Sequence, residues 1–149
     1  MAEIARLIRY DELDKLLELY EVLHPEDPSV RADPSLKPLW DEIYANPGLF
    51  YIVVEADGEI VSSCTLAVVK NLTRGLRPYG VVENVITRPD QRKKGYATMA
   101  LHKAIEIARG QGCYKVMLLS GARDEATLRF YEHAGFARGV KTGFIVDLK

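Results

Sequence analysis

Residues 81–108 read VVENVITRPDQRKKGYATMALHKAIEIA and carry the clearest fold signal in the chain. Residues 81–87 are rich in β-branched and apolar side chains, which favours a buried strand. A basic turn follows, and the next segment predicts a helix from about Tyr96 to Arg109 because its apolar residues recur at helical spacing. The apolar face of this helix comprises Ala97, Ala100, Leu101, Ala104, Ile105 and Ala108.

The chain downstream continues the alternation of strand and helix. Two glycines end the helix, and residues 115–120 are short and apolar, as in a second buried strand. A strand, a crossover helix and a strand make a βαβ unit, whose two strands are parallel. Residues 124–134 predict a last helix, and residues 136–148 (FARGVKTGFIVDL) predict two more strands.

The chain upstream begins with a strand and two helices. Residues 3–9 predict the strand, and Asp11 is a suitable N-cap for a helix with a leucine-rich stripe. Four prolines in residues 24–38 predict a loop, because proline lacks a main-chain N–H and disrupts helices. A short helix through Trp40 and Tyr44 is expected next.

A hairpin precedes the βαβ unit. Residues 49–56 and 59–70 are strand-like and flank Asp57-Gly58, a pair typical of a type I′ turn. Hairpin strands are antiparallel, whereas the strands of the βαβ unit are parallel. The sequence therefore predicts an α/β fold with a mixed sheet of six to seven strands and helices on both faces.

Composition excludes several classes of protein. The length of 149 residues suits one domain over 1–149. Lys and Arg number 20 and Asp and Glu 21, a net charge of −1, so we expect no nucleic-acid partner and no anionic membrane surface as partner. The longest uncharged stretch, 43–54, is too short to span a bilayer, and the N-terminus lacks the apolar core of a signal peptide.

The cysteines indicate neither a metal site nor a nucleophile. Cys64 and Cys113 have no metal-binding spacing, and no carboxylate and histidine cluster has it either, so we expect no metal. Neither cysteine lies near a candidate base, which disfavours a Cys-based acyl-enzyme. Two free thiols are typical of a reducing compartment, so a cytoplasmic protein is expected.

The basic turn has the features of an anion site. It lies where a helix begins, and there the first main-chain N–H groups have no partner within the helix. Gly95 lets the backbone approach a ligand closely, and Arg92, Lys93 and Lys94 add positive charge. These features suit a pyrophosphate, although a solvated basic turn explains the same residues. The P-loop and Rossmann glycine patterns do not occur in the chain.

Two motifs resemble the GCN5-related N-acetyltransferases (GNAT family). Arg92-x-x-Gly95-x-Ala97 is similar to the family's acyl-CoA signature, Q/R-x-x-G-x-G/A. Residues 124–136, with FYEHAGF at their end, are similar to the segment N-x-x-A-x-x-F-Y-x-x-x-G-F. This chain departs from that segment at two positions: Asp124 stands where the family often has Asn, and Thr127 stands where it often has Ala. FYEHAGF and the earlier GCYKV are also similar to glucosamine-phosphate acetyltransferases.

The resemblance implies direct transfer of the acetyl group of acetyl-CoA to an amine. The pantetheine arm would pair with the main chain of Val85, Ile86 and Thr87, as an added strand pairs with a sheet edge. A β-bulge near Asn84 would present an amide to the thioester oxygen. Asp124 is a further candidate for binding the cosubstrate. The pyrophosphate would be held by Arg92, Lys93, Lys94, Gly95, Tyr96, Ala97 and Thr98.

Two side chains are candidates for catalysis. An ammonium group must lose a proton before it attacks a thioester, and Glu83 is the candidate base, because burial beside Val81 and Val85 would make it more basic. The alternative is a strand-edge glutamate paired with an arginine, namely Arg74, Arg77 or Arg88. Tyr131 occupies the family's usual position for a proton donor to the leaving thiolate, although an aromatic residue at that spacing also suits the core.

The expected acceptor is the primary amine of a small molecule. A peptide or protein amine is the second possibility, and a non-catalytic CoA-binding module is the third. The segments expected to select the acceptor are residues 24–38, the helix with Trp40 and Tyr44, and residues 71–79. Glu26, Asp27 and Asp33 suit a cationic amine, whereas Arg74 and Arg77 suit a phosphate or carboxylate on the acceptor, and the sequence does not choose between them. A homodimer is also expected, since exposed strand edges near the C-terminus invite pairing.

Overall fold

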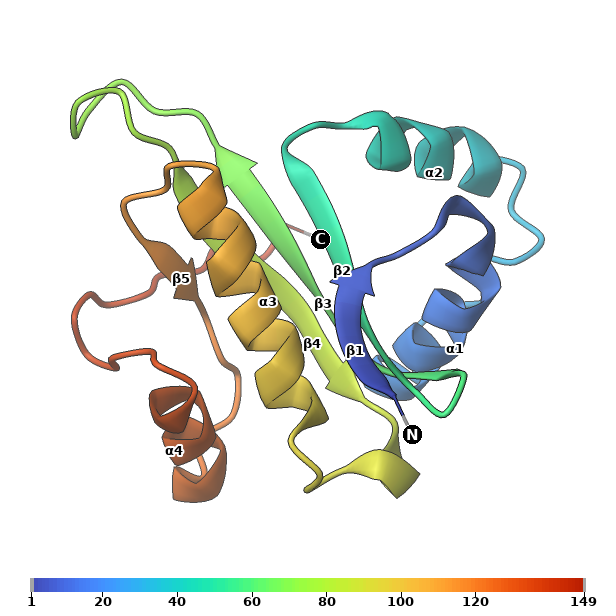
Figure 1. Cartoon of the computed structure of the whole chain (residues 1–149). Coiled ribbons are helices and arrows are strands. Elements are labelled where there is room, and N and C mark those ends of the chain that lie inside the picture. Colours follow the sequence, from blue (N-terminus) through green and yellow to red (C-terminus); the bar gives the residue numbers. More distant parts are fainter. Residues whose placement is uncertain (1, 149) are drawn as a thin grey trace.

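The computed structural model describes residues 2–148 and contains one five-stranded sheet in the order β1-β2-β3-β4-β5 (Figure 1). The strands are β1 (Glu3–Leu7), β2 (Leu49–Ala56), β3 (Glu59–Val69), β4 (Tyr79–Thr87) and β5 (Val116–Leu118). The helices are α1 (Leu13–Leu23), α2 (Leu36–Ala45), α3 (Tyr96–Gly110) and α4 (Glu125–His133), with short 3-10 turns at Tyr10–Glu12 and Pro89–Gln91.

The sheet is mixed, as the sequence predicts. β1, β2, β3 and β4 pair antiparallel in succession, whereas β5 is parallel to β4 and is reached through α3. The β2–β3 connection has φ values of 53° at Asp57 and 78° at Gly58, the left-handed conformation of a type I′ turn. The predicted hairpin and the βαβ unit are both confirmed.

Helices cover both faces of the sheet, and each face has its own apolar cluster. On the α3 side, Ile52, Cys64 and Leu66 pack with the alanines of α3, and part of α4 closes this cluster. On the other side, Trp40 of α2 and the leucines of α1 pack against Val53 and Ile86. Figure 1 shows α3 on one side of the strands and α1 with α2 on the other.

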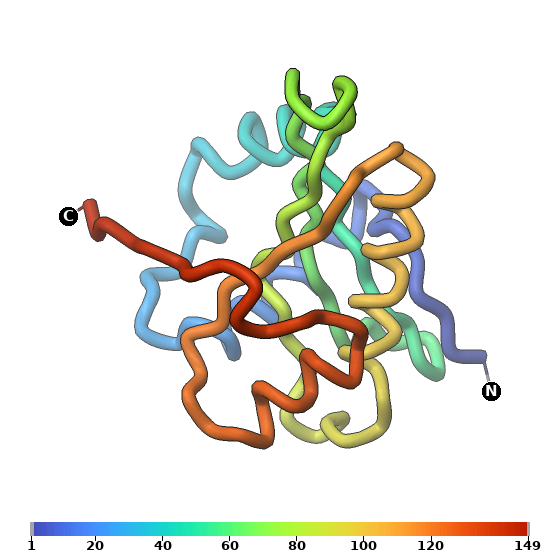
Figure 2. Tube along the Cα trace, turned by 90° about the vertical axis from the view of Figure 1, so that its left-hand side faces the viewer, coloured from blue at the N-terminus to red at the C-terminus, as the bar shows by residue number. Residues whose placement is uncertain are grey.

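The predicted strand number of six to seven is wrong, because residues 136–148 form no strand. β5 is only three residues long and pairs only with β4 in the described chain, so it offers a short edge for any further strand. The C-terminal segment instead leaves its side chains in solvent, with Phe144 90% and Ile145 81% exposed. Figure 2 shows this segment (red) running past the sheet and away from α3.

The start of α1 also differs from the prediction. A 3-10 turn precedes the helix, so Asp11 lies inside that turn and is not the N-cap. Glu12 is the N-cap residue of α1 but makes no side-chain cap hydrogen bond to it; its Oε1 instead accepts a hydrogen bond from the main-chain N–H of Arg9 at 2.7 Å, at the start of the 3-10 turn. The guanidinium of Arg6 donates to the carboxylates of Glu12 and Glu55 at 2.8 Å each, which ties the helix start to β1 and β2.

Candidate active site

β4 has an open edge beside β5. It pairs with β3 from Tyr79 to Thr87, but with β5 only through the three residues Gly80–Val82. Beyond Val82, no strand of residues 2–148 pairs with β4 on this side. The main chain of residues 83–87 therefore borders a gap in which an extended ligand can add to the sheet.

A β-bulge interrupts β4 at this edge. Thr65 of β3 lies opposite Glu83, but Ser63 lies opposite Ile86, so β4 contains one extra residue within this interval. Asn84 has a φ of +54°, a left-handed conformation that is uncommon for a residue with a side chain. The bulge predicted near Asn84 is thus present.

The main-chain groups around the bulge point in two directions. The carbonyl of Ile86 accepts the hydroxyl of Ser62 at 2.9 Å, and the N–H of Arg88 donates to Val61 at 2.8 Å, so these residues face β3. Since main-chain groups alternate along a strand, Val85 and Thr87 face the open edge. Of the three residues predicted to pair with pantetheine, only Val85 and Thr87 have that orientation.

Glu83 is placed differently from the prediction. Its side chain is exposed, and it lies in a cross-strand row with Thr65 and Tyr51 on the face that α1 and α2 cover. Val85 packs into the cluster on the α3 face, because the extra residue reverses the alternation between Glu83 and Val85. The predicted burial of Glu83 and its shared face with Val85 are therefore wrong.

The alternative role for Glu83 as an ion-pair partner is not seen in the described chain. Arg88 lies 3.0 Å from the carboxylate of Asp90, and Arg77 donates to the carbonyls of Gly112 and Cys113 at 3.1 and 3.0 Å. Arg74 lies over the ring of Tyr114, 5.3 Å from its centroid. The Glu83 side chain is exposed on the sheet face that α1 and α2 cover.

The turn before α3 has the local geometry predicted for an anion cradle, meaning unpaired main-chain N–H groups beside exposed cations. Gly95 is the N-cap with a φ of +86°, and no side chain caps the helix. The main-chain N–H of Met99 donates to the carbonyl of Gly95 at 3.0 Å, so the amides of Tyr96, Ala97 and Thr98 precede the first bond of the helix. A Cβ at Gly95 would meet no atom within 4 Å, so the space beside this residue is open.

The side chains of the turn divide into exposed cations and one buried phenol. Arg92, Lys93 and Lys94 are exposed, and Arg92 reaches back to the carbonyl of Thr87 with its Nε at 3.3 Å. Tyr96 is buried, and its hydroxyl donates to Glu3 at 2.8 Å, an interaction that raises the pKa of Tyr96. Tyr96 can therefore offer only its main-chain amide to an anion.

Helix α4 brings Tyr131 toward the bulge from the α3 side. The Tyr131 ring packs 5.0 Å from Phe130 and 6.4 Å from Phe136, centroid to centroid, and burial raises its pKa. Tyr131 packs against the apolar cluster that contains Cys64, the β3 residue between Ser63 and Thr65 where the register shifts. Glu83 and Tyr131 thus lie near the bulge but on opposite faces of the sheet.

Asp124 serves the start of α4. Its Oδ2 accepts the main-chain N–H of Thr127 at 3.0 Å and the Thr127 hydroxyl at 2.8 Å. These hydrogen bonds, first of all the main-chain one, lower the pKa of Asp124. Thr127, which stands where the resembling family often has Ala, therefore completes the N-cap.

A family model described as the acetyltransferase (GNAT) family matches residues 16–136, most of the chain. The chain belongs to the acetyltransferase (GNAT) family. A putative acetyltransferase of Agrobacterium tumefaciens has a similar structure, with a TM-score of 0.90 and 41% identity over 97% of this chain and 99% of that one. An acetyltransferase of Trypanosoma brucei gives a TM-score of 0.78 and 30% identity, covering 99% of this chain and 100% of that one.

Curated relatives include two N-acetyltransferases. Glucosamine 6-phosphate N-acetyltransferase of Trypanosoma brucei brucei is 40% identical over 79 residues, which are 53% of this chain and 52% of that protein. An uncharacterized N-acetyltransferase of Escherichia coli is 33% identical over 105 residues, or 70% of this chain and 60% of that protein. The chain thus spans about half the length of the first of these relatives.

Other polar features of this GNAT chain have structural roles. Burial raises the pKa of Cys64 to about 12, and its thiol donates to the carbonyl of Ala100 at 3.5 Å, so this cysteine is not a nucleophile. His102 Nε2 lies 3.2 Å from the carbonyl of Ala134 and links α3 to the end of α4. Within residues 2–148 there is neither a group of three or more His, Cys, Asp or Glu residues that could hold a metal nor a helix able to span a membrane.

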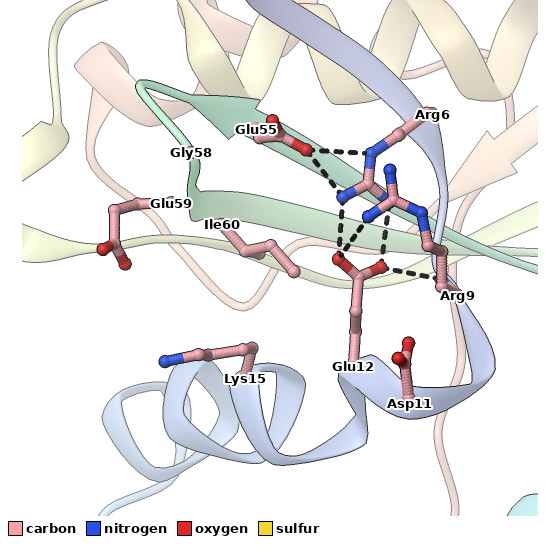
Figure 3. Close-up of a pocket in the computed structure, with 9 residues that line it drawn as sticks. All are labelled: Arg6, Arg9, Asp11, Glu12, Lys15, Glu55, Gly58, Glu59 and Ile60. Carbon is pink, nitrogen blue, oxygen red and sulfur yellow. Dashed lines mark hydrogen bonds and ion pairs between the residues drawn. The ribbon is translucent and has the colours of Figure 1, made fainter.

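A charged hollow lies at the β1 edge of the sheet, opposite the β5 edge, between β1, β2 and the start of α1 (Figure 3). Arg6 lies in its wall and binds both Glu12 and Glu55, and Arg9 approaches Glu12 at 3.4 Å. The charges of these residues are thus matched by one another. These ion pairs stabilise the junction of β1 with α1, and the hollow is separate from the β4 edge.

Proposed function

We propose that this protein is an acetyl-CoA-dependent N-acetyltransferase that acts directly on the primary amine of a small molecule. The observation that carries the proposal is the open β4 edge, which begins with the bulge at Asn84 and ends beside the anion cradle at Gly95. A ligand with an extended polar arm and a pyrophosphate matches both features at once. Residues 1–149 would act as one acetyltransferase domain.

The cradle fits the pyrophosphate of acetyl-CoA. The amides of Tyr96, Ala97 and Thr98 lie at the positive end of the α3 dipole, and the cations of residues 92–94 surround them. Val85 and Thr87 would hydrogen-bond the pantetheine arm. Asp124 lies outside this donor set in our proposal, since its carboxylate caps α4.

The proposed chemistry uses one side chain from each face of the sheet beside the bulge, Glu83 on one face and Tyr131 on the other. The amine nitrogen attacks the thioester carbon, and the bulge amide stabilises the oxyanion that forms. Glu83 accepts the proton that the amine loses, and Tyr131 donates a proton to the CoA sulfur as the carbon–sulfur bond breaks. Since burial raises the pKa of Tyr131, its phenol remains protonated at neutral pH and can act as the donor.

The loop that carries Arg77 is set apart from the proposed acceptor site. Arg77, expected to bind an anionic group of the acceptor, is bonded to Gly112 and Cys113 and lies seven residues before Asn84, roughly 20 Å along the strand. The acceptor would therefore enter beside Glu83, from the α1 and α2 side. Amino sugars are the first acceptors to test, since relatives are named glucosamine 6-phosphate N-acetyltransferases.

Two measurements test this function. Acetyl-CoA at about 100 times its Kd should raise the Tm by roughly 5–10 °C. A panel of amino sugars, aminoglycosides, polyamines, amino acids and peptides should then release free CoA thiol with the correct acceptor. Binding without thiol release from any amine would favour a CoA-binding module, and release with peptides alone would favour a peptide acetyltransferase. Neither binding nor release would overturn the proposal.

We further propose a homodimer that works in the cytoplasm. Five apolar side chains of the C-terminal segment 140–148 are 74–90% exposed: Val140, Phe144, Ile145, Val146 and Leu148. Such a segment is expected to pack against a second copy. Light scattering should give the mass of a dimer, and truncation after Gly139 should give a monomer. Two unpaired cysteines support a reducing compartment.

A further inference from the structure

The turn that leads into α3 has little support from its own side chains. Residues 92–95 are all exposed, and Lys93 and Gly95 have left-handed φ values of 64° and 86°. Arg92 reaches the carbonyl of Thr87 at 3.3 Å, and Lys94 reaches the side chain of Gln91 at 3.1 Å, both on the surface. Exposed hydrogen bonds between near neighbours in the sequence give a segment little rigidity.

Tyr96 is the first buried residue after this turn. It is 7% exposed, and its ring is part of the apolar cluster between α3 and the sheet. Its hydroxyl donates to Oε2 of Glu3 at 2.8 Å, although the two residues are 93 positions apart in the sequence. Hydrogen bonds to a carboxylate are stronger than those between neutral groups. The residue that opens α3 is therefore attached both to the core and to a distant strand.

Glu3 is held by the sheet. It lies on β1 opposite Ala56 of β2, in the antiparallel register of the two strands. Side chains two residues apart share a face of a strand, and Ala5 packs against the cluster on the α3 side. Figure 1 shows the starts of β1 and α3 at the same end of the sheet. The phenol of Tyr96 is thus bonded to a carboxylate whose position the strand pairing fixes.

The side chain and the amide of Tyr96 belong to the same helical turn. The amides of Tyr96, Ala97 and Thr98 precede the first main-chain bond of α3, and no side chain caps them. A contact that fixes the Tyr96 side chain therefore also fixes the direction of these three N–H groups. Hydrogen bonds weaken steeply when donor and acceptor are misaligned, so the affinity for an anion depends on this direction.

We propose that the hydrogen bond between Tyr96 and Glu3 holds the first turn of α3 against β1 and thereby aims the amides of residues 96–98 at the pyrophosphate of the acyl donor. The Tyr96 hydroxyl and Glu3 are then positioning residues, because neither touches the donor. This role rests on the proposed binding of acetyl-CoA and is independent of the acceptor.

Tyr96→Phe tests the role of the hydroxyl and keeps the buried ring. The Kd for CoA, measured by calorimetry, is expected to rise about tenfold. The Kd for pantetheine, which lacks the pyrophosphate and is followed by an NMR titration, should stay within about twofold. A purely structural role would lower the Tm by a few degrees and leave both Kd values unchanged.

Glu3→Ala breaks the same hydrogen bond from an exposed position, where a substitution disturbs folding least. It should weaken CoA binding about as much as Tyr96→Phe does. The double variant should bind CoA no more weakly than either single variant, since one interaction is lost in all three. Glu3→Gln keeps an oxygen that can accept the phenol hydrogen and should restore most of the affinity. Effects that multiply in the double variant would contradict the proposal.

Tyr10→Phe is the matched control. The Tyr10 hydroxyl also donates to a carboxylate, that of Asp41 on α2, but this pair lies on the opposite face of the sheet from α3. Its loss should leave the Kd for CoA within about twofold. Equal weakening of CoA binding by Tyr10→Phe and Tyr96→Phe would show a general loosening of the fold and would overturn the positioning role.

The outcomes for the wild-type protein separate this role from the proposed function. If the wild-type protein binds no CoA, both are overturned. If it binds CoA and Tyr96→Phe binds CoA equally well, only the positioning role is overturned. The same holds if Tyr96→Phe loses affinity for pantetheine to the same degree as for CoA.

Discussion

Thr65 of β3 lies directly opposite Glu83 of β4, and the register slips by one residue immediately beyond this pair. The slip leaves Glu83 on the face covered by α1 and α2 and turns Val85 toward α3. A thioester laid along the open edge would therefore have a carboxylate on one face and the Tyr131 phenol on the other. The bulge is the element that separates the proposed base from the proposed acid.

Gly95→Ala tests the anion cradle. The φ of +86° strains any residue with a Cβ, so the turn is expected to shift and the Kd for acetyl-CoA to rise about tenfold. Gly58→Ala is the control, because Gly58 has a similar φ of +78° and equally open space, but lies in the β2–β3 turn. Both variants should lower the Tm by a few degrees in differential scanning fluorimetry. Equal Kd values for both variants would exclude a role of the cradle in donor binding.

Glu83→Gln tests the proposed base. Loss of general base catalysis is expected to lower kcat by about 10²–10³ while the Kd for acetyl-CoA stays the same. Glu42→Gln changes an exposed carboxylate on α2 and should leave kcat unchanged. Steady-state assays of thiol release measure both. Full activity of Glu83→Gln would show that the amine loses its proton to another group.

Tyr131→Phe tests the proposed acid. Because a thiol leaves tolerably without help, kcat should fall only about tenfold or less. Burial raises the pKa of Tyr131, so the wild-type activity that depends on its proton should persist as pH rises through the range where an ordinary tyrosine ionises. The variant should lack the alkaline fall in kcat that ionisation of this phenol produces. An identical alkaline limb in both proteins would argue for a packing role alone.

Cys64 is expected to make the free energy of unfolding fall as pH rises in the alkaline range. Burial raises the pKa of its thiol from 9.0 to about 12, so the neutral form is favoured in the folded protein. Stability from this group is complete below pH 9, declines as the thiol of the unfolded chain ionises, and is lost as pH rises toward 12. Urea unfolding between pH 8 and pH 11 should show this decline. Cys64→Ala should reduce the slope, and an unchanged slope would contradict this assignment.

Much of the fold could be predicted because its signals are local. Asp57-Gly58 forms the expected turn since both residues adopt a positive φ, and α3 begins where Gly95 interrupts the strand-turn segment. The two GNAT motifs lie on the elements expected for them. These features depend on the conformational preferences of neighbouring residues and require no information about distant parts of the chain.

Apart from the N-cap assigned to Asp11, which a local 3-10 turn displaces, the incorrect predictions depend on contacts between distant residues. The family resemblance predicted the bulge, but the faces on which it places Glu83 and Val85 depend on the register with β3. Residues 136–148 have strand-like composition, but a strand needs an edge to pair with, and β5 offers only three residues. Ile86 faces β3 because of its place in the register. No pattern in the sequence signals that Tyr96 would meet Glu3.

Local sequence was thus sufficient to predict the helices, the hairpin, the anion cradle and the family, because each is encoded by adjacent residues or short spacings. The face that each side chain of β4 occupies, the open edge beside β5 and the meeting of Tyr96 with Glu3 were settled by folding. These depend on how β3 and β4 pair and on how α3 packs against β1, and one extra residue in a ladder reverses every orientation that follows it.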